Sequence, residues 1–167
     1  MWIILQAALR AGRKKFGYIE ERGVNYLHLM TILNFPEGRN DGGYEVVDSH
    51  SVQPELGTME DIEELCTECR ERVISVCLDF VMNHSSEAHE WAKRAKAGDW
   101  EYQNCYYFYD NYDIQSMYEN EKTVPQVFPT TAPRNLTYNH ETGKFVMTTF
   151  YPYQWDLNYH NPIILNR

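Results

Sequence analysis

Three polar side chains, Asp79, Asn83 and His84, stand at the end of a nearly unbroken apolar run that starts at Val73. The run is short and rich in Val and Ile, which predicts a strand buried on both faces of a parallel sheet. Sites form at the carboxyl ends of such strands, where a carboxylate can stabilise positive charge and a histidine can orient a ligand. The alternative is that Asp79 caps a turn and His84 is an ordinary loop residue.

A helix and a second strand are predicted before this run. Thr58 suits an N-cap, and Glu60 and Asp61 fall in the first turn, where they meet the positive end of the helix dipole. The apolar face comprises Met59, Ile62, Leu65, Cys66 and Cys69. Residues 24–33 predict a strand, and residues 34–44, rich in Pro, Asn and Gly, predict a loop. Strand, loop, helix and strand form a βαβ unit with a right-handed crossover.

The remaining segments are less regular. Residues 5–22 favour a helix that stops near Gly23, and a short helix is expected after His84, capped by Ser85 or Ser86 and ended by Gly98. Between Asp99 and Phe150 the helical period disappears, apart from a hairpin turn at residues 141–143, which predicts an irregular insertion. Asn161 and Pro162 are typical of a helix cap and a first helical position.

Composition limits the classes of function. The chain has 167 residues, enough for one domain, and its net charge of −9 disfavours nucleic acid and fits a neutral or cationic ligand. No apolar run reaches the length of a membrane helix, and no signal peptide is recognisable, so no membrane partner is expected. The four cysteines contain a single C-x-x-C pair, Cys66 and Cys69, which does not complete a zinc site. Buried reduced thiols are favoured, and with them a reducing, cytoplasmic location.

Several segments, in order along the chain, resemble one enzyme family. The stretch Asp79-Phe80-Val81-Met82-Asn83-His84 resembles the first sequence region of the α-amylase superfamily, a strand end of the form D-x-x-x-N-H. Asn40-Asp41-Gly42-Gly43-Tyr44 resembles the loop after the preceding strand of that superfamily. Further segments resemble its amylosucrase branch: residues 26–30, 36–38, 106–108, 127–129, 148–150 and 154–159. Residues 111–122 depart from the pattern of this branch, in which that segment shapes recognition of the acceptor.

The resemblance implies the fold class α/β, as part of a (β/α)8 TIM barrel with a small irregular α+β domain inserted after the third strand. The two predicted strands would be the second and third of that barrel. Residues 1–84 would form the partial barrel, residues 85–150 the inserted domain, and residues 151–167 the return to the barrel with the start of its third helix. A barrel alone takes about 250 residues, so 167 residues are not expected to close one.

The resemblance also assigns roles at the glucosyl pocket. Asp41 would hydrogen bond to the glucosyl ring, Tyr44 would stack on it, and His84 would donate to one of its hydroxyls. Glycoside cleavage passes through a cationic state, which a carboxylate and an electron-rich ring help to stabilise. Because adjacent parallel strands lie about 4.8 Å apart, Asp41, Tyr44 and His84 are expected to converge in one cleft. Simple loop packing is the alternative for Tyr44.

Four further residues receive roles from the resemblance. Phe150 would form a wall of the pocket, and Gln154 would reach the neighbouring sugar. Asp79 and Asn83 would hold the loops at the strand end. The alternative for Gln154 is that it satisfies backbone groups. Asn83 matches a position that binds calcium in many α-amylases, but the amylosucrase branch is not expected to require it, so neither a metal nor a cofactor is predicted.

The catalytic residues are expected beyond Arg167. In the family, a carboxylate nucleophile and a carboxylic acid about 5 Å apart follow the fourth and fifth strands, so none is assigned in this chain, which alone is expected to be inactive. The leading hypothesis is part of an amylosucrase-like enzyme that cleaves sucrose and builds α-glucan. The alternatives are a sucrose hydrolase, a trehalose synthase, an oligo-glucosidase, or a truncated non-catalytic protein that binds sugar. The expected partner is a small sugar substrate.

Overall fold

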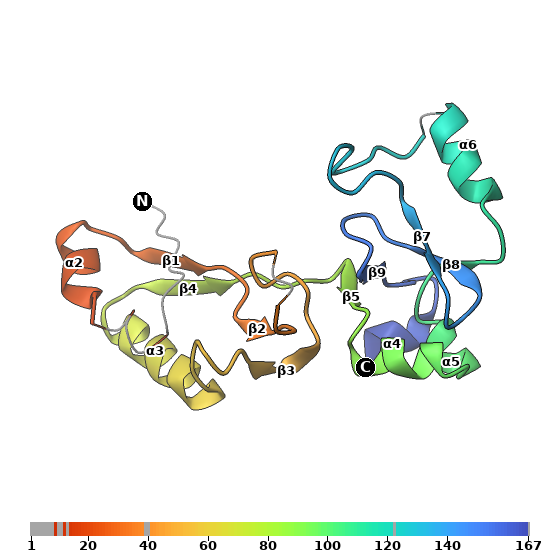
Figure 1. The fold of residues 1–167 in the computed structure, drawn as a ribbon. Coiled ribbons are helices and arrows are strands. Elements are labelled where there is room, and N and C mark those ends of the chain that lie inside the picture. Colours follow the sequence, from red (N-terminus) through yellow and green to blue (C-terminus); the bar gives the residue numbers. More distant parts are fainter. Residues whose placement is uncertain (1–8, 10–11, 13, 39–40, 122, 167) are drawn as a thin grey trace. The chain divides into compact units, whose positions relative to one another are not determined.

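The computed structural model describes residues 9, 12, 14–38, 41–121 and 123–166. They belong to two compact units, Met1–Val81 and Met82–Arg167 (Figure 1). The helix expected over residues 5–22 falls largely on residues outside the described ones. Its described part is α2, Phe16–Glu21, with Phe16 and Ile19 buried. The division of the chain at residues 84 and 150 into barrel and insertion stays a prediction.

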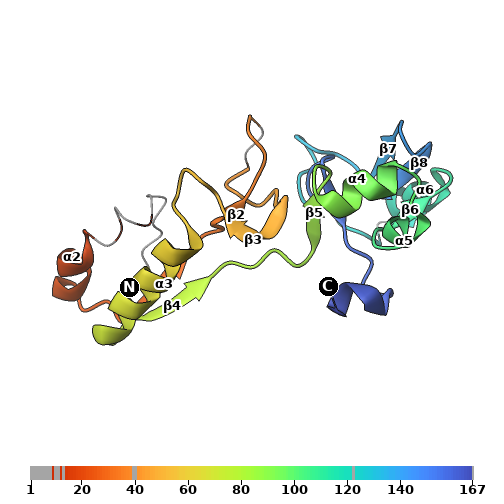
Figure 2. The same cartoon turned by 90° about the horizontal axis from the view of Figure 1, so that it is seen from below.

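The first unit is built on the predicted βαβ arrangement. Strand β1, Tyr26–Leu29, pairs in parallel with β4, Ser75–Leu78, and α3, Met59–Glu71, lies between them in the chain. Figure 2 shows α3 running beside β4. Two short strands, β2 (Leu33–Asn34) and β3 (Asp48–Val52), form an antiparallel pair, and both follow β1 and precede α3 in the sequence. The strand predicted over residues 24–33 is therefore divided into β1 and the start of β2.

Capping fixes the start of α3 as the sequence predicts. The Thr58 hydroxyl accepts a hydrogen bond from the Asp61 backbone N–H at 3.3 Å, and the Asp61 carboxylate accepts one from the Thr58 N–H at 3.0 Å. This reciprocal box satisfies two N–H groups that a helix start leaves without partners. The face that α3 turns to the core contributes Ile62, Leu65 and Cys69, which join Leu27 and Leu29 of β1.

The other end of α3 corrects the expected strand. Val73 N–H bonds the Arg70 carbonyl and Ile74 N–H bonds the Cys69 carbonyl, a Schellman closure that puts Val73 at φ 57°. Val73 thus ends the helix, and β4 begins only at Ser75. The expectation of burial on both faces is wrong for the described residues, because Val73 is 84% and Phe80 68% exposed. The core lies on one face of the β1–β4 pair, and β4 pairs only with β1 among these residues.

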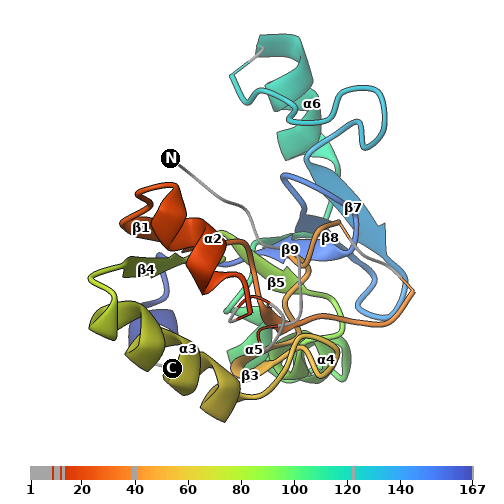
Figure 3. The same cartoon turned by 90° about the vertical axis from the view of Figure 1, so that its left-hand side faces the viewer.

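The second unit is an α+β arrangement. Strand β5, His84–Ser86, pairs with β9, Gln154–Asp156, and a three-stranded antiparallel sheet has the order β6–β8–β7. The sheet strands are β6 Phe108–Tyr109, β7 Leu136–Asn139 and β8 Lys144–Met147, with β7 and β8 side by side in Figure 3. The helices are α4 Glu90–Lys96, α5 Trp100–Gln103, α6 Asp113–Glu121 and the 3-10 helix η1 Pro162–Asn166.

The core of this unit gathers aromatic and small side chains around Trp155. Tyr106 and Phe108 contact Trp155 edge to face, with ring centroids 5.4 and 5.5 Å apart. Ala92 and Ala95 of α4 are fully buried and let the helix approach closely. The edge-to-face geometry is the arrangement that aromatic quadrupoles favour. The core therefore joins α4 and α5 to β8 and β9.

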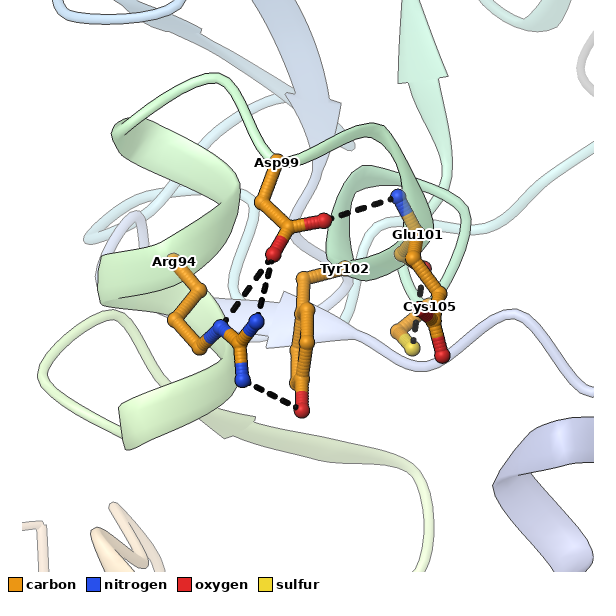
Figure 4. A network of polar contacts seen from close by, with 5 residues as sticks. All are labelled: Arg94, Asp99, Glu101, Tyr102 and Cys105. Atoms are coloured by element: carbon orange, nitrogen blue, oxygen red, sulfur yellow. Dashed lines mark hydrogen bonds and ion pairs between the residues drawn. The ribbon is translucent and has the colours of Figure 1, made fainter.

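A polar network joins α4 to α5 (Figure 4). The Arg94 guanidinium donates to Asp99 Oδ2 from Nη2 at 2.7 Å and from Nε at 3.2 Å, and its Nη1 donates to the Tyr102 hydroxyl at 3.0 Å. Asp99 Oδ1 accepts the Glu101 N–H at 3.1 Å, so Asp99 is also the N-cap of α5. The Cys105 thiol donates to the Glu101 carbonyl. One carboxylate thus bonds a side chain of α4 and caps the start of α5.

Several predictions about this unit need correction. The cap of α4 is His89, whose Nδ1 accepts the Trp91 N–H at 3.1 Å, because Ser85 and Ser86 belong to β5. Residues 99–150, predicted to lack helices, contain α5 and α6. Helix α6 buries only Gln115 and therefore shows no apolar stripe in the sequence. The hairpin between β7 and β8 is confirmed. The Asn161 cap is confirmed as well, but the helix that it starts is 3-10.

The four cysteines, Cys66, Cys69, Cys77 and Cys105, are free thiols. Burial raises the pKa of the Cys69 thiol to about 11, which keeps it protonated and unreactive. Among the residues that the structure describes, no helix has both the length and the apolar character needed to cross a membrane.

Candidate functional site

In the first unit, the candidate site is centred on Asp79, which directly follows β4. His28 pairs in register with Cys77, and Asp79 lies two residues beyond Cys77. Alternate residues of a strand share a face, so the pleat brings His28 and Asp79 to the same side of the pair. Leu27 and Leu29 are buried in the core on the opposite side. The β1–β4 pairing therefore places an imidazole and a carboxylate together away from the core.

The two oxygens of the Asp79 carboxylate have different partners. The Tyr44 hydroxyl donates to Oδ2 at 2.6 Å, and His28 Nε2 lies 2.5 Å from Oδ1. An ionised carboxylate only accepts, so the His28 ring donates here. The Tyr44 hydrogen bond, followed by that of His28, lowers the pKa of Asp79, whereas partial burial opposes this. The same bond to Asp79 raises the pKa of Tyr44, so the phenol stays a donor.

A glycine pair delivers Tyr44 to this position. Gly42 and Gly43 have φ values of +92° and +91°, which L side chains rarely adopt. A Cβ on Gly43 would stand 3.1 Å from the Thr31 carbonyl oxygen, a tight contact that a side chain could relieve only by displacing the Thr31 backbone slightly. Asp41 stands at the start of this turn and is half-buried. Asn40, quoted with this loop, lies outside the described residues.

In the second unit, the candidate site is formed where β5 pairs with β9. The register sets His84 opposite Asp156, and the Asn83 amide donates to Asp156 Oδ1 at 3.1 Å. Thr149 donates to Asp156 twice, from its hydroxyl to Oδ2 and from its backbone N–H to Oδ1 at 3.2 Å. Through Asp156, these donors link Asn83 of the D-x-x-x-N-H segment to Thr149. Asn83 thus bonds a residue of β9, and its role in holding the loops at the strand end stays a prediction.

Asp156 is 5% exposed, and its surroundings act on its charge in both directions. Burial raises the pKa of Asp156 because it penalises the ionised form. The hydrogen bonds from Thr149 and Asn83 and the positive charge of His84, when protonated, act in the opposite sense. The ionisation of Asp156 therefore depends on the balance between burial and these neighbours.

His84 and Phe150 are brought together in this unit. Their ring centroids are 5.2 Å apart with the planes tilted by 55°, and Phe128 lies 6.3 Å beyond Phe150. His84 is buried and Phe150 is half-buried. Gln154 is 1% exposed, and its Oε1 accepts the Tyr151 N–H at 3.1 Å. Gln154 therefore satisfies a backbone group, and its contact with a second sugar stays a prediction.

The predicted site residues are divided between the units: Asp41, Tyr44 and Asp79 belong to the first, and Asn83, His84, Phe150 and Gln154 belong to the second. The convergence of Asp41, Tyr44 and His84 concerns residues of both units and stays a prediction.

Sequence reasoning assigned no role to His28, Thr149 or Asp156. All three stand in segments quoted for the family resemblance. For His28 a signal existed, since strict alternation with the apolar Leu27 and Leu29 puts it on the face away from the core. For Asp156 no local pattern distinguishes a buried, bonded carboxylate from an exposed one.

Two pockets lined by described residues lie away from these site residues. A pocket of about 410 Å³ in the first unit is lined by residues 34–38 and 53–55. One of about 360 Å³ in the second unit is lined by residues 100, 101, 104, 158 and 160–163. Neither contains a predicted site residue. Within the described part of the chain, no three His, Cys, Asp or Glu side chains are grouped so that they could hold a metal ion, and the expected absence of a metal stays a prediction.

Relatives are identified by sequence. The trehalose synthase of Pimelobacter sp. is 34% identical over 150 residues, covering 89% of this chain and 25% of that protein. Maltase 1 of Drosophila virilis is 33% identical over 162 residues, covering 94% of this chain and 24% of that protein. The chain thus spans about a quarter of the length of the curated relatives it matches.

Solved structures also resemble this chain in fold. Trehalose-6-phosphate hydrolase of Bacillus licheniformis superimposes with a TM-score of 0.81 at 26% identity, covering 99% of this chain and 31% of that one. The trehalulose synthase MutB gives a TM-score of 0.83 at 24% identity, with the same two coverages, which shows likeness of fold. Residues 10–167 match the family described as alpha amylase, catalytic domain. The chain therefore belongs to the α-amylase catalytic-domain family.

Proposed function

We propose that this chain supplies glucosyl-binding residues to an enzyme that cleaves or rearranges α-glucosidic bonds. One observation carries the proposal: the Tyr44 hydroxyl bonds the Asp79 carboxylate at 2.6 Å. This bond joins the Gly-Gly-Tyr loop to the D-x-x-x-N-H strand end. Those are the two segments that most resemble sugar-contacting parts of the family.

Tyr44 and Asp41 are proposed to contact the glucosyl ring from the first unit. Breaking an α-glucosidic bond leaves positive charge on the ring, and a negative carboxylate and an electron-rich aromatic face stabilise such charge. The hydrogen bond that the Tyr44 hydroxyl donates to Asp79 raises the pKa of Tyr44 and keeps the phenol neutral, and we propose that its ring stacks on the glucosyl ring. Asp79 is proposed to hold Tyr44 rather than to touch the sugar, because both of its oxygens already have partners.

His84 and Phe150 are proposed to contribute from the second unit. A histidine that hydrogen bonds a ring hydroxyl fixes the orientation of a sugar, and orientation lowers the barrier to reaction. Phe150 packs against His84 and limits the positions that the imidazole can take. Asn83 and Asp156 support the same strand end. Gln154, whose Oε1 accepts the Tyr151 N–H, is proposed as the contact to the neighbouring sugar.

The nucleophile and the acid of the reaction are proposed to lie outside these 167 residues. For the substrate, the resemblance to the amylosucrase branch favours sucrose as donor and α-glucan as product. The trehalose synthase and maltase relatives favour trehalose and maltose as alternatives. The four free thiols support a reducing compartment such as the cytoplasm.

A panel of ligands tests the proposal. Saturation-transfer NMR on the chain is measured with sucrose, trehalose and maltose, and with melibiose as a galactosyl control. Transfer to the glucosyl protons of the first three, and not to the galactosyl protons of melibiose, is expected. The strongest of the three signals identifies the preferred substrate. Equal transfer to the galactosyl ring, or none to any ligand, would contradict an α-glucosyl site.

A further inference from the structure

We propose that His28 is a positioning residue for Tyr44, and that it acts through the carboxylate of Asp79. The proposal rests on the proposed function for the statement that Tyr44 contacts the sugar. The positioning itself is independent of the proposed function, because it concerns only three side chains of the first unit. His28 comes from β1, Tyr44 from the glycine loop, and Asp79 from the end of β4.

Two hydrogen-bond donors, one on each oxygen, fix the orientation of a carboxylate plane, whereas a single donor does not. The terminal torsion of an aspartate is broad, so one hydrogen bond still lets the carboxylate plane turn. Here Oδ1 lies 2.5 Å from His28 Nε2, and Oδ2 lies 2.6 Å from the Tyr44 hydroxyl. Hydrogen bonds to an ionised acceptor are short and strong. With Oδ1 held by His28, Oδ2 presents a fixed acceptor to Tyr44.

The backbone that carries His28 and Asp79 is held in place by the β1–β4 pair and the core. The Asp79 N–H bonds the Leu29 carbonyl at 3.1 Å, which extends the β1–β4 ladder past Leu78. His28 stands between two buried leucines, so its backbone cannot move without disturbing the core. The His28 and Asp79 side chains are 29% and 24% exposed, which shields their contact partly from water. The order of the core is thereby transmitted to the loop that carries Tyr44.

The consequence for binding is a tyrosine ring that is oriented before a ligand arrives. A ligand that must order a mobile aromatic ring loses affinity. Removing the His28 donor is expected to weaken binding of methyl α-D-glucoside to the chain by about threefold, the size of one immobilised side chain. A glutamine at position 28 keeps an N–H donor at a similar reach, whereas a methionine of similar size has none.

The direct test places 3-fluorotyrosine at position 44 and records its single fluorine NMR resonance in the 167-residue chain. The fluorine stands next to the hydroxyl and senses its hydrogen bond. We expect His28→Met to shift and broaden this resonance, and His28→Gln to restore it largely. An unchanged resonance in His28→Met, or equal effects of Gln and Met, would overturn positioning by hydrogen bonding.

A second measurement needs no substitution at position 28. The nitrogen NMR shifts of His28 in the otherwise unaltered chain report which ring nitrogen carries the proton. We expect a protonated Nε2 whose signature is lost in Asp79→Asn. An Nε2 without a proton, or one indifferent to Asp79→Asn, would overturn the proposal.

Adding methyl α-D-glucoside separates this inference from the proposed function. If the His28 variants behave as expected but the sugar leaves the fluorine resonance unmoved, Tyr44 is positioned but is not a sugar contact. If the sugar shifts the resonance while His28→Met leaves it unaltered, the sugar contact stands and the positioning role is wrong.

Discussion

The imidazole of His84 and the phenyl ring of Phe150 lie with their centroids 5.2 Å apart and their planes tilted by 55°. Phe150 also contacts Phe128, at 6.3 Å between centroids. Phe150 thus packs on the histidine of the D-x-x-x-N-H strand end. This contact gives Phe150 a supporting role besides the wall that the family resemblance implies.

Replacing Phe150 is expected to loosen the second unit. Phe150→Ala removes the contacts with His84 and Phe128, and the half-buried ring is expected to cost about 2 kcal/mol of unfolding free energy. Urea unfolding of the chain measures the change. Phe150→Leu, which keeps most of the volume, is the matched control and should lose less than half of that. Equal stability of wild type and Phe150→Ala would contradict a packing role.

Val73 is expected to be a site of local strain. It takes φ 57° at the end of α3, where glycine is the usual residue, and its side chain is 84% exposed. Val73→Gly is expected to raise the unfolding free energy by roughly 1 kcal/mol, since relief of the left-handed strain exceeds the backbone entropy of glycine. Thermal or urea unfolding checks this, with Val73→Ala as the control that keeps a Cβ. A glycine variant less stable than wild type would disprove the strain.

Asp79 is expected to stabilise the folded chain in its ionised form. Its folded pKa is lowered, first by the Tyr44 hydrogen bond and then by His28, below the value of about 3.9 in the unfolded chain. The stabilisation is therefore present above the unfolded pKa and is lost as the pH falls through the folded pKa. Carboxyl carbon NMR should give Asp79 a low midpoint that rises in Tyr44→Phe but not in the control Tyr138→Phe. A midpoint indifferent to Tyr44→Phe would refute this.

The pKa of Asp156 is expected to lie above the ordinary value of an aspartate, in contrast to that of Asp79. Burial raises its folded pKa, although Thr149, His84 and Asn83 oppose the rise. Its contribution to stability is thus complete below the unfolded pKa and is lost as the pH increases through the folded pKa. Carboxyl NMR should show a raised midpoint, and Thr149→Val should raise it further because a donor to the ionised form is gone. A midpoint lowered by Thr149→Val would contradict this arrangement.

The sequence is sufficient where the signal is local. The Thr58 cap, the buried face of α3 from Ile62 to Cys69 and the turn between β7 and β8 depend on neighbouring residues and are confirmed, whereas Met59, predicted on the same face, is 45% exposed. The βαβ order also follows from local patterns, because a helix between two strands favours a parallel pair.

The sequence is insufficient where a distant segment decides. An apolar run predicts a buried strand, yet burial also needs covering elements on both faces, and Phe80 is 68% exposed. The partners of Asp79 and Asp156 lie far along the chain, and residue type alone does not reveal them. Hydrophobic periodicity does not predict helix α6, because periodicity detects a helix only through its buried face and α6 buries one residue.

The central claim is that the family-like residues contact an α-glucosyl ring, and affinity for methyl α-D-glucoside tests it most directly. Saturation-transfer titration gives the dissociation constant for wild type, Tyr44→Ala and His84→Ala, with Tyr138→Ala and His140→Ala as exposed controls of the same types. Each site variant is expected to weaken binding about tenfold, the size of one lost strong contact, while the controls match wild type. Wild-type affinity in both Tyr44→Ala and His84→Ala, or weakening as large in the controls, would contradict the account.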